Sequence, residues 1–250
     1  MIFNKRVVIT GADGVVGTAL GNLLNGAALL RLSNKSTPPV DIRDYPALKS
    51  KIKDFAPQII IHLAAKTDVD WCENNQDECY SVNAQGTENI CKIAAELDSS
   101  LLYASTLYVY SGDKDDAYDE RFDSPDINTI KSVYARSKLI GERRVADLIG
   151  DMSFIVRFGA VFGGGIKDKK FVRKLLDKAR KEKVIRVVSD RTLTLAYADD
   201  IARNIKELIK TDLYGIYNMV NQGRLTYYDY AAKIIEYAGI KDVELIPVPA

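Results

Sequence analysis

A tyrosine and a lysine stand four residues apart in the segment SVYARSKLIGE, residues 132–142. On a helix, positions i and i+4 share one face, so Tyr134 and Lys138 would project together. A phenol titrates at about pH 10, and a neighbouring ammonium lowers that pKa because it stabilises the phenolate. Such a tyrosine can give its proton to a ketone oxygen while the carbonyl carbon is reduced. The pair is a candidate catalytic site, although an ordinary amphipathic helix would show the same spacing.

A hydroxyl group at the end of a predicted strand is the next candidate. The segment SLLYAST, residues 100–106, ends in Ser105 and Thr106, where a hydroxyl can hydrogen-bond a substrate oxygen. The alternative is ordinary β-propensity, which favours threonine in any strand. His62 is the only histidine of the chain and lies within another predicted strand. We expect it to be a buried structural residue rather than a catalytic one.

Three glycines connect the first predicted strand to the first predicted helix. The segment VVITGADGVVG places Gly11, Gly14 and Gly17 in the spacing GxxGxxG. Gly11 would allow a tight turn, Gly14 the close approach of a pyrophosphate, and Gly17 close packing of the helix on the sheet. The N-terminus of the helix would then face the anion. We interpret the loop as a dinucleotide-binding site, with a purely structural turn as the alternative.

The residues after the second predicted strand bear on which dinucleotide is bound. An NAD-binding unit usually carries Asp or Glu about 20 residues after the glycine motif, where it holds the ribose 2′-hydroxyl. Here the segment RLSNKS supplies Arg31, Ser33 and Lys35, and the next acid is Asp41. A guanidinium with nearby hydroxyl and ammonium donors suits a 2′-phosphate. We therefore predict NADP, with NAD as the alternative.

Strands and helices alternate along the first two thirds of the chain. Apolar, β-branched runs predict strands at 5–10, 27–32, 57–65, 100–106 and 153–158, and helical spacing predicts helices at 14–25, 44–55, 78–97 and 134–149. This alternation predicts an α/β fold with a parallel sheet and right-handed crossovers. Shorter elements follow at 168–183, 197–210, 215–220, 226–238 and 243–248. We expect them to form a small lobe on the sheet rather than an independent domain.

Composition limits the classes of function. The 250 residues are 47% hydrophobic and 28% charged with a net charge of +1, which gives no general electrostatic case for nucleic acid or an anionic membrane. Three cysteines without metal-ligand spacing suggest neither a metal site nor a disulfide framework. The chain contains no long apolar run and no signal-peptide pattern. We expect a cytoplasmic protein.

A basic stretch stands in the C-terminal third. Residues 167–186, KDKKFVRKLLDKARKEKVIR, are rich in Lys and Arg, while apolar positions such as Phe171 and Leu175 form a stripe at helical spacing. A solvated helix face is the default interpretation. The alternative is that one or two of these cations bind a sugar-nucleotide diphosphate.

Together, TGADGVVG, SVYARSKLIGE and Thr106 resemble the extended short-chain dehydrogenase/reductase superfamily. The segments IIIHLAAKTDVDWCE, SVNAQGTENI, STLYVYSG, YDE, SKLIGE and GIYNMV follow, in order, the pattern of its dTDP-4-dehydrorhamnose reductase-like branch. The resemblance covers nearly the whole chain. It implies a Rossmann-type doubly wound parallel sheet with a small C-terminal substrate-binding lobe. It also implies NADPH-dependent reduction of a nucleotide-linked 4-keto sugar.

The resemblance also implies roles for individual residues. Thr106, Tyr134 and Lys138 would be catalytic, and Lys138 would also hold the nicotinamide ribose. Besides Gly11, Gly17, Arg31, Ser33 and this Tyr–Lys pair, the cofactor contacts would be Asp13, Gly14, Val15, Val16, Asp41, Ile42, Ala64, Ala65 and Lys66. The whole chain would be one unit, with residues 1–157 mainly dinucleotide-binding and 158–250 contributing the substrate lobe. A homodimer is the expected assembly.

The chain differs from this branch on the substrate side. Leu107 replaces the Asp that usually follows the catalytic Thr, and Ile130, Ser132 and Ala135 replace usual neighbours of the tyrosine. Phe158, Gly159 and Ala160 replace a substrate-facing Thr-Ser-Trp. Two alternatives stay open: a sugar-nucleotide epimerase that retains its cofactor, and a non-catalytic NADP-binding regulatory subunit of the same branch.

Overall fold

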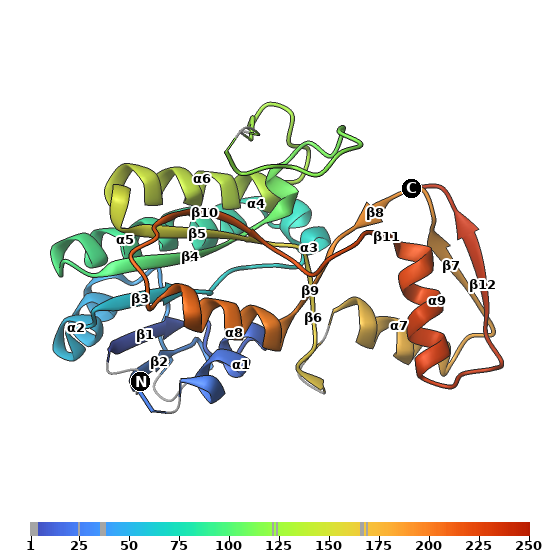
Figure 1. The fold of residues 1–250 in the computed structure, drawn as a ribbon, viewed down its shortest axis with the longest axis horizontal. Helices are drawn as coiled ribbons and strands as arrows, with labels where there is room; N and C mark the ends of the chain where they lie inside the picture. The colour runs from blue at the N-terminus through green and yellow to red at the C-terminus, as the bar shows by residue number, and fades with distance from the viewer. Residues whose placement is uncertain are drawn as a thin grey trace.

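A six-stranded parallel sheet forms the larger of two bodies in the computed structural model, which describes residues 5–24, 26–35, 39–121, 123, 125–165, 168 and 170–250 (Figure 1). Its strands are β1 (Arg6–Thr10), β2 (Ala28–Leu32), β3 (Ile59–His62), β4 (Ser100–Thr106), β5 (Ser153–Phe158) and β10 (Gly215–Met219). The order across the sheet is β10-β5-β4-β3-β1-β2, and every pairing is parallel. The order reverses between β1 and β3, where sheets of this type bind ligands. The predicted α/β class is confirmed.

Helices cover both faces of this sheet. Alternate strand residues point to opposite faces, so Val7 and Ile9 of β1 pack with α1 (Val15–Leu23) and α8 (Ala198–Leu208). Val8 points the other way, toward the apolar side chains of α2 (Tyr45–Phe55), α5 (Gly86–Glu96) and α6 (Val133–Leu148). This doubly wound arrangement brings the N-terminus of α1 and the first turn of α6 to the carboxyl ends of the strands.

The predicted helix at 78–97 is wrong in its bounds and continuity. The chain forms α3 (Val69–Asn74), α4 (Gln76–Tyr80), a π-helical turn η1 (Ser81–Gln85) and then α5. Asn75 leaves helical geometry between the first two, with φ −137° and ψ 56°. In the wider π turn, the side chain of Asn83 binds the backbone of Lys66, a tertiary contact that helical spacing does not encode.

The smaller body is a C-terminal lobe at the right of Figure 1. It contains α7 (Phe171–Ala179), β7 (Val184–Val188), α9 (Tyr227–Tyr237) and β12 (Glu244–Val248), and β7 pairs with β12 in parallel. Leu175, Ile185 and Ile235 form part of its separate apolar core. α7 is shorter than the predicted helix at 168–183, and Lys167 and Lys169 lie outside the described residues.

Two short strand pairs link the bodies: β6 (Ala160–Phe162) with β9 (Leu195–Tyr197), and β8 (Thr192–Leu193) with β11 (Leu225–Thr226). The region after residue 158 is divided between the bodies, because α8 packs on α1 and β10 extends the main sheet. In the described part of the chain, no helix has the length and apolarity needed to cross a membrane.

Candidate active site

The glycine loop lies across the end of β3. Gly11 adopts φ +66°, and a Cβ atom there would lie only 2.7 Å from the backbone nitrogen of Ala64. A Cβ at Gly17 would lie 2.5 Å from the Gly11 carbonyl oxygen. Gly14 precedes α1, and no side chain of the described residues caps that helix. The first N–H groups of α1 therefore face an exposed loop formed by Asp13 and Gly14, a geometry that suits a phosphate group.

The structure brings Arg31 to this loop. Its Nη2 donates to the Ala12 carbonyl at 3.1 Å, and its guanidinium lies against Gly21 of α1. Ser33 is buried just beyond β2, and its hydroxyl accepts a hydrogen bond from the Lys35 N–H at 3.0 Å. Of the residues predicted to select NADP, Arg31 thus contacts the loop directly.

Asp41 and Ile42 lie on the neighbouring connection. The Asp41 carboxylate pairs with Arg43 at 2.6 Å, and hydrogen bonding from this guanidinium lowers the pKa of Asp41. Ile42 is buried, and its side chain packs directly against Gly86. A Cβ atom added at Gly86 would lie only 2.6 Å from the Cδ1 atom of Ile42. The Asn89 side chain donates to the Ile42 carbonyl at 3.0 Å, so this segment is held rigidly.

The segment after β3 is fixed from both sides. The N–H of Ala64 donates to Thr10 Oγ1 at 3.3 Å, and Ala65 is half-buried. Asn83 binds both backbone groups of Lys66, at 2.8 Å and 3.0 Å. The Lys66 ammonium pairs with Glu78 at 3.0 Å and lies 4.4 Å from the ring centroid of Trp71.

His62 is the buried structural residue that the sequence predicts. Its Nδ1 lies 2.7 Å from Thr10 Oγ1, and its Nε2 lies 3.1 Å from Thr87 Oγ1. Burial and the nearby Lys138 charge lower the pKa of His62 to about 3. The imidazole is therefore neutral at physiological pH.

Thr106 and Tyr134 meet at the carboxyl end of β4. Both side chains are buried, and Thr106 Oγ1 accepts the Tyr108 N–H at 3.3 Å. Burial raises the pKa of Tyr134, while hydrogen bonding with Thr106 opposes that change. The thiols of Cys72 and Cys79 pack on the same ring and raise the pKa further. The phenol is therefore protonated at neutral pH, as a proton donor must be.

Lys138 extends inward from the same helix. Its side chain is 2% exposed, and its Nζ lies 4.0 Å from the ring centroid of Tyr103 on β4. Burial lowers the pKa of Lys138 to about 7, and the Glu142 carboxylate opposes this change. The predicted lowering of the phenol pKa is not found, because burial is the largest influence on Tyr134 and the lysine points toward the sheet.

Sequence reasoning missed the residues that seat α6 on the sheet. The Tyr103 hydroxyl donates to the Lys138 carbonyl at 3.2 Å, and a Cβ at Gly141 would lie 2.1 Å from that hydroxyl oxygen. Asn83 donates to Ser137 Oγ at 2.9 Å. The glycine inside SKLIGE was the available signal, since a glycine within a helix often marks a close approach.

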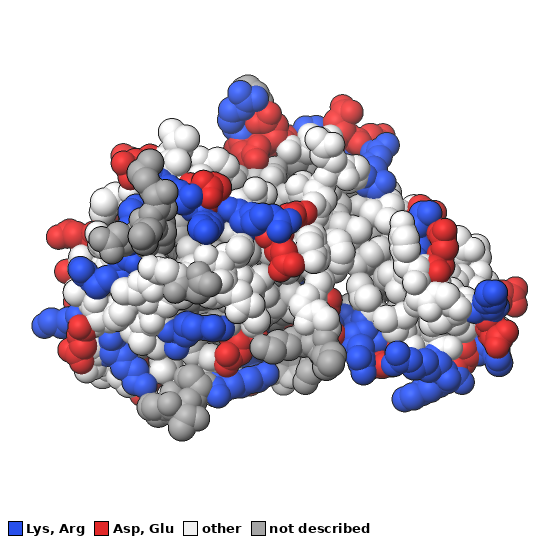
Figure 2. All heavy atoms as spheres, turned by 60° about the horizontal axis from the view of Figure 1, so that its bottom comes forward, with Lys and Arg blue, Asp and Glu red and all other residues white. Residues whose placement is uncertain are grey.

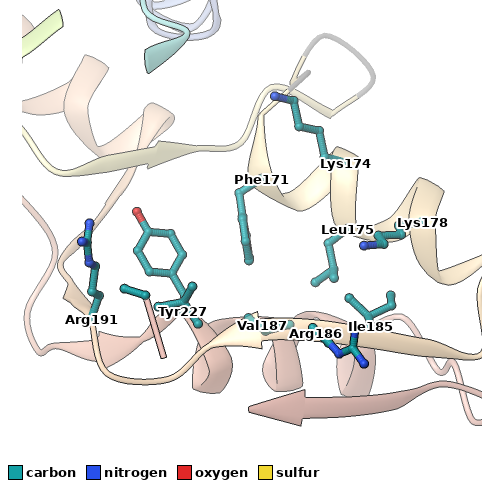
Figure 3. A pocket seen from close by; sticks show the side chains of 11 residues that line it. Phe171, Lys174, Leu175, Lys178, Ile185, Arg186, Val187, Arg191 and Tyr227 are labelled. Carbon is teal, nitrogen blue, oxygen red and sulfur yellow. The ribbon is translucent and has the colours of Figure 1, made fainter. Parts of the chain in front are cut away.

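A cavity of about 550 Å³ opens in the C-terminal lobe beside α7 (Figure 3). Four cationic side chains line it: Lys174, Lys178, Arg186 and Arg191. In Figure 3 the phenol of Tyr227 lies between Arg191 and the ring of Phe171. Figure 2 shows Lys and Arg gathered along the edge of this lobe.

Tyr108 connects this cavity to the catalytic candidates. It lies in the short 3-10 turn after Thr106, and its hydroxyl is 2.8 Å from the hydroxyl of Tyr227, a residue of the cavity wall. The Tyr108 backbone N–H donates to Thr106 Oγ1 at 3.3 Å, at the other end of the same residue. The cavity and the Thr106–Tyr134 pair are therefore two ends of one region.

Comparisons with known proteins identify the family and the fold. The family model of the RmlD substrate binding domain matches residues 5–250. The dTDP-4-dehydrorhamnose reductase of Aggregatibacter actinomycetemcomitans is 32% identical over 250 residues, covering 97% of this chain and 83% of that protein. The Bacillus anthracis str. Ames dTDP-4-dehydrorhamnose reductase, solved in complex with NADP, has a TM-score of 0.90 at 33% identity, covering 99% and 85% of the two chains. The UDP-glucose 4-epimerase of Thermus thermophilus, at 22% identity and TM-score 0.84 over 98% and 86% of the chains, shares the fold.

Proposed function

Since the chain belongs to the family of the RmlD substrate binding domain, we propose that it is an NADPH-dependent reductase of a nucleotide-linked 4-keto sugar, similar to dTDP-4-dehydrorhamnose reductase. The observation that carries the proposal is the arrangement of Thr106 and Tyr134 at the end of β4, with Lys138 one turn along α6. The similar Bacillus anthracis reductase, solved in complex with NADP, supports the choice of cofactor.

The residues present fit such a cofactor. The close packing of Gly11 and Gly17, together with the open N-terminus of α1, leaves backbone N–H groups for the pyrophosphate. Arg31 and Ser33 would hold the 2′-phosphate, and Lys138 would bind the nicotinamide ribose. The contacts at residues 13–16, 41–42 and 64–66 remain part of this proposal.

The chain's own residues would handle the proton and the carbonyl. When bound, the nicotinamide supplies a hydride to the carbonyl carbon. Thr106 would donate a hydrogen bond to the carbonyl oxygen and orient it. Tyr134 would transfer its phenolic proton to that oxygen, while Lys138 would hold the nicotinamide ribose next to it.

The cavity beside α7 would receive the nucleotide part of the substrate. Its arginines and lysines suit a diphosphate, and Phe171 and Tyr227 offer aromatic surfaces for a base or sugar. The sugar of the substrate would then lie near the hydrogen bond between Tyr108 and Tyr227, on the side of the cavity that faces Thr106 and Tyr134.

Replacing Arg191 by Ala is expected to raise the KM for the nucleotide sugar about tenfold, because a charge-assisted contact to a diphosphate would be lost. The affinity for NADPH should not change. Steady-state kinetics and fluorescence titration would measure the two values. Arg180→Ala, directly after α7 and outside the cavity lining, is the matched control. An Arg191→Ala enzyme with unchanged KM would contradict the placement of the diphosphate.

Replacing Arg31 by Ala is expected to weaken NADPH binding about tenfold while NADH binding changes little. The physical reason is that only NADPH carries the 2′-phosphate that this guanidinium would bind. Paired titrations with both cofactors measure the ratio, and Arg203→Ala, at an exposed position of α8, is the control. Equal losses for NADPH and NADH would show that Arg31 acts only on loop structure.

The cellular location and the oligomeric state are further parts of the proposal. The three cysteines are free thiols in the structure, which supports a cytoplasmic location. A nucleotide sugar is the proposed small-molecule partner, and the homodimer stays a prediction. Sedimentation measurements on the purified protein would test the latter.

A further inference from the structure

A buried ion pair connects α6 to the sheet behind the catalytic candidates. The side chains of Glu142 and Arg157 are only 5% and 2% exposed. Arg157 Nη2 donates to Glu142 Oε2 at 2.7 Å, and Arg157 Nε donates to Glu142 Oε1 at 3.0 Å. This two-point contact fixes the carboxylate in position and orientation.

The same carboxylate contacts the strand that ends in Thr106. Ser105 Oγ donates to Glu142 Oε1 at 2.5 Å, and Ser105 directly precedes Thr106. Glu142 lies one helical turn after Lys138 on α6. One side chain therefore ties the helix of Tyr134 and Lys138 to the strand end that carries the third candidate.

Arg157 is held in turn. It lies beside Ser105 in the register of β4 and β5, and its Nη1 donates to the Tyr110 hydroxyl at 2.7 Å. The Tyr110 hydroxyl donates to Asn218 Oδ1 on β10 at 3.3 Å. The pair thus belongs to a connected buried network across three strands and one helix.

Stability does not explain this arrangement. Two charges removed from water are expensive, and apolar residues of similar volume often stabilise a fold equally well. Since Ser105 directly precedes Thr106 and Lys138 lies one turn before Glu142 on α6, a role in the chemistry of these residues is the better explanation.

The electrostatic surroundings of Lys138 define that role. The titratable groups facing its ammonium are His62 from β3, Tyr103 from β4, Cys79 from α4 and Glu142 from α6 itself. The imidazole and the buried phenol are neutral at physiological pH, because burial lowers the pKa of one and raises that of the other. Among these groups, the Glu142 carboxylate is therefore the main support for a positive charge.

We propose that Glu142, fixed by Arg157 and Ser105, is a positioning residue that keeps Lys138 charged and holds α6 against the end of β4. Only the catalytic purpose of Lys138 in this inference rests on the proposed function. The electrostatic relation itself can be measured without substrate or cofactor.

The test uses the double variant Glu142→Leu/Arg157→Met, which removes both charges and leaves neither partner buried alone. In protein with isotopically labelled lysine, the NMR titration of Lys138, assigned by its loss in Lys138→Arg, gives the midpoint directly. Wild type should titrate near pH 7 and the variant at a lower pH, because Glu142, rather than Arg157, is the member of the pair that acts on the Lys138 ammonium. The matched control is Glu88→Leu/Arg144→Met, a partly exposed pair whose Arg144 also lies on α6.

An unchanged midpoint in the double variant would overturn the proposal. If that variant does not fold, Glu142→Gln decides by the same titration, since it keeps a hydrogen-bond acceptor for Ser105 and lacks the charge. NADPH binding, followed through the single tryptophan Trp71, gives a second measurement. The loss of NADPH affinity at alkaline pH should begin at a lower pH in the variant than in the wild type. An equal loss of affinity at every pH would overturn the proposal. Both measurements stand even if no keto sugar is reduced.

Discussion

Replacing Tyr134 by Phe is expected to lower kcat for NADPH-dependent carbonyl reduction by about 10²–10⁴-fold, the usual contribution of a general acid. The phenol is buried against Thr106, and its raised pKa keeps the proton available at neutral pH. Phe preserves the ring and its packing on Cys72 and Cys79, so only the hydroxyl is lost, with its proton and its hydrogen bond to Thr106. NADPH affinity should stay close to that of the wild type. Stopped-flow oxidation of NADPH and a separate binding titration measure the two effects.

Tyr237→Phe is the matched control, because that side chain is 86% exposed on α9. It should leave kcat and cofactor binding unchanged. Turnover at the wild-type rate in Tyr134→Phe would remove this residue from the mechanism.

Replacing Lys138 by Met is expected to have two opposite effects. Catalytic efficiency should fall by about 10²-fold or more, because the ammonium proposed to hold the nicotinamide ribose in position is lost. The cofactor-free protein should become more stable at pH 6, because a buried ammonium is replaced by an apolar chain of similar length. Urea unfolding and steady-state kinetics measure these changes on the same preparations.

The stability gain should depend on pH in a defined direction. Burial lowers the pKa of Lys138 to about 7 from the ordinary value of 10.5, so the unfolded chain binds more protons between these values. Below pH 7 the full penalty of burying the charge is present, and it is relieved as pH rises toward 10.5. The advantage of Lys138→Met over wild type should therefore shrink as pH rises from 7 to 9. Lys241→Met, at an exposed position, should show no such trend, and a constant difference in the Lys138 variant would contradict the assigned pKa.

Local patterns in the sequence predicted the main-sheet strands well. The strands at 100–106 and 153–158 have the predicted bounds, because both are buried apolar runs with clear ends. The glycine turn and, within one residue, the start of α6 were also predicted, since turn glycines and helical spacing act within a few residues. Elements whose shape is decided by neighbouring residues could be found from sequence.

Features decided by distant contacts could not be found in this way. The π turn exists around Asn83, whose partners Lys66 and Ser137 are 17 and 54 residues away. Glu142 and Arg157 meet because parallel register places β5 beside β4 under α6. The direction of Lys138 likewise depends on the ring of Tyr103. Spacing along one helix predicted that Tyr134 and Lys138 share a face, but it could not predict these contact partners.

The basic stretch at 167–186 shows an intermediate case. Its helical stripe predicted the packing of Phe171 and Leu175, and both lie in the core or cavity of the C-terminal lobe. The sequence left open whether its cations face solvent or a diphosphate. Lys174, Lys178 and Arg186 line the cavity in the structure, but Arg191, just beyond the stretch, and Tyr227, from α9, complete it.

The most direct test of the central claim is NADPH oxidation with a panel of dTDP- and UDP-linked 4-keto sugars, followed at the nicotinamide absorbance. The account predicts oxidation with at least one of these sugars, one equivalent of reduced sugar per NADPH, and slower turnover with NADH. Tight NADPH binding without oxidation by any keto sugar would contradict it and would favour a cofactor-binding regulatory subunit instead.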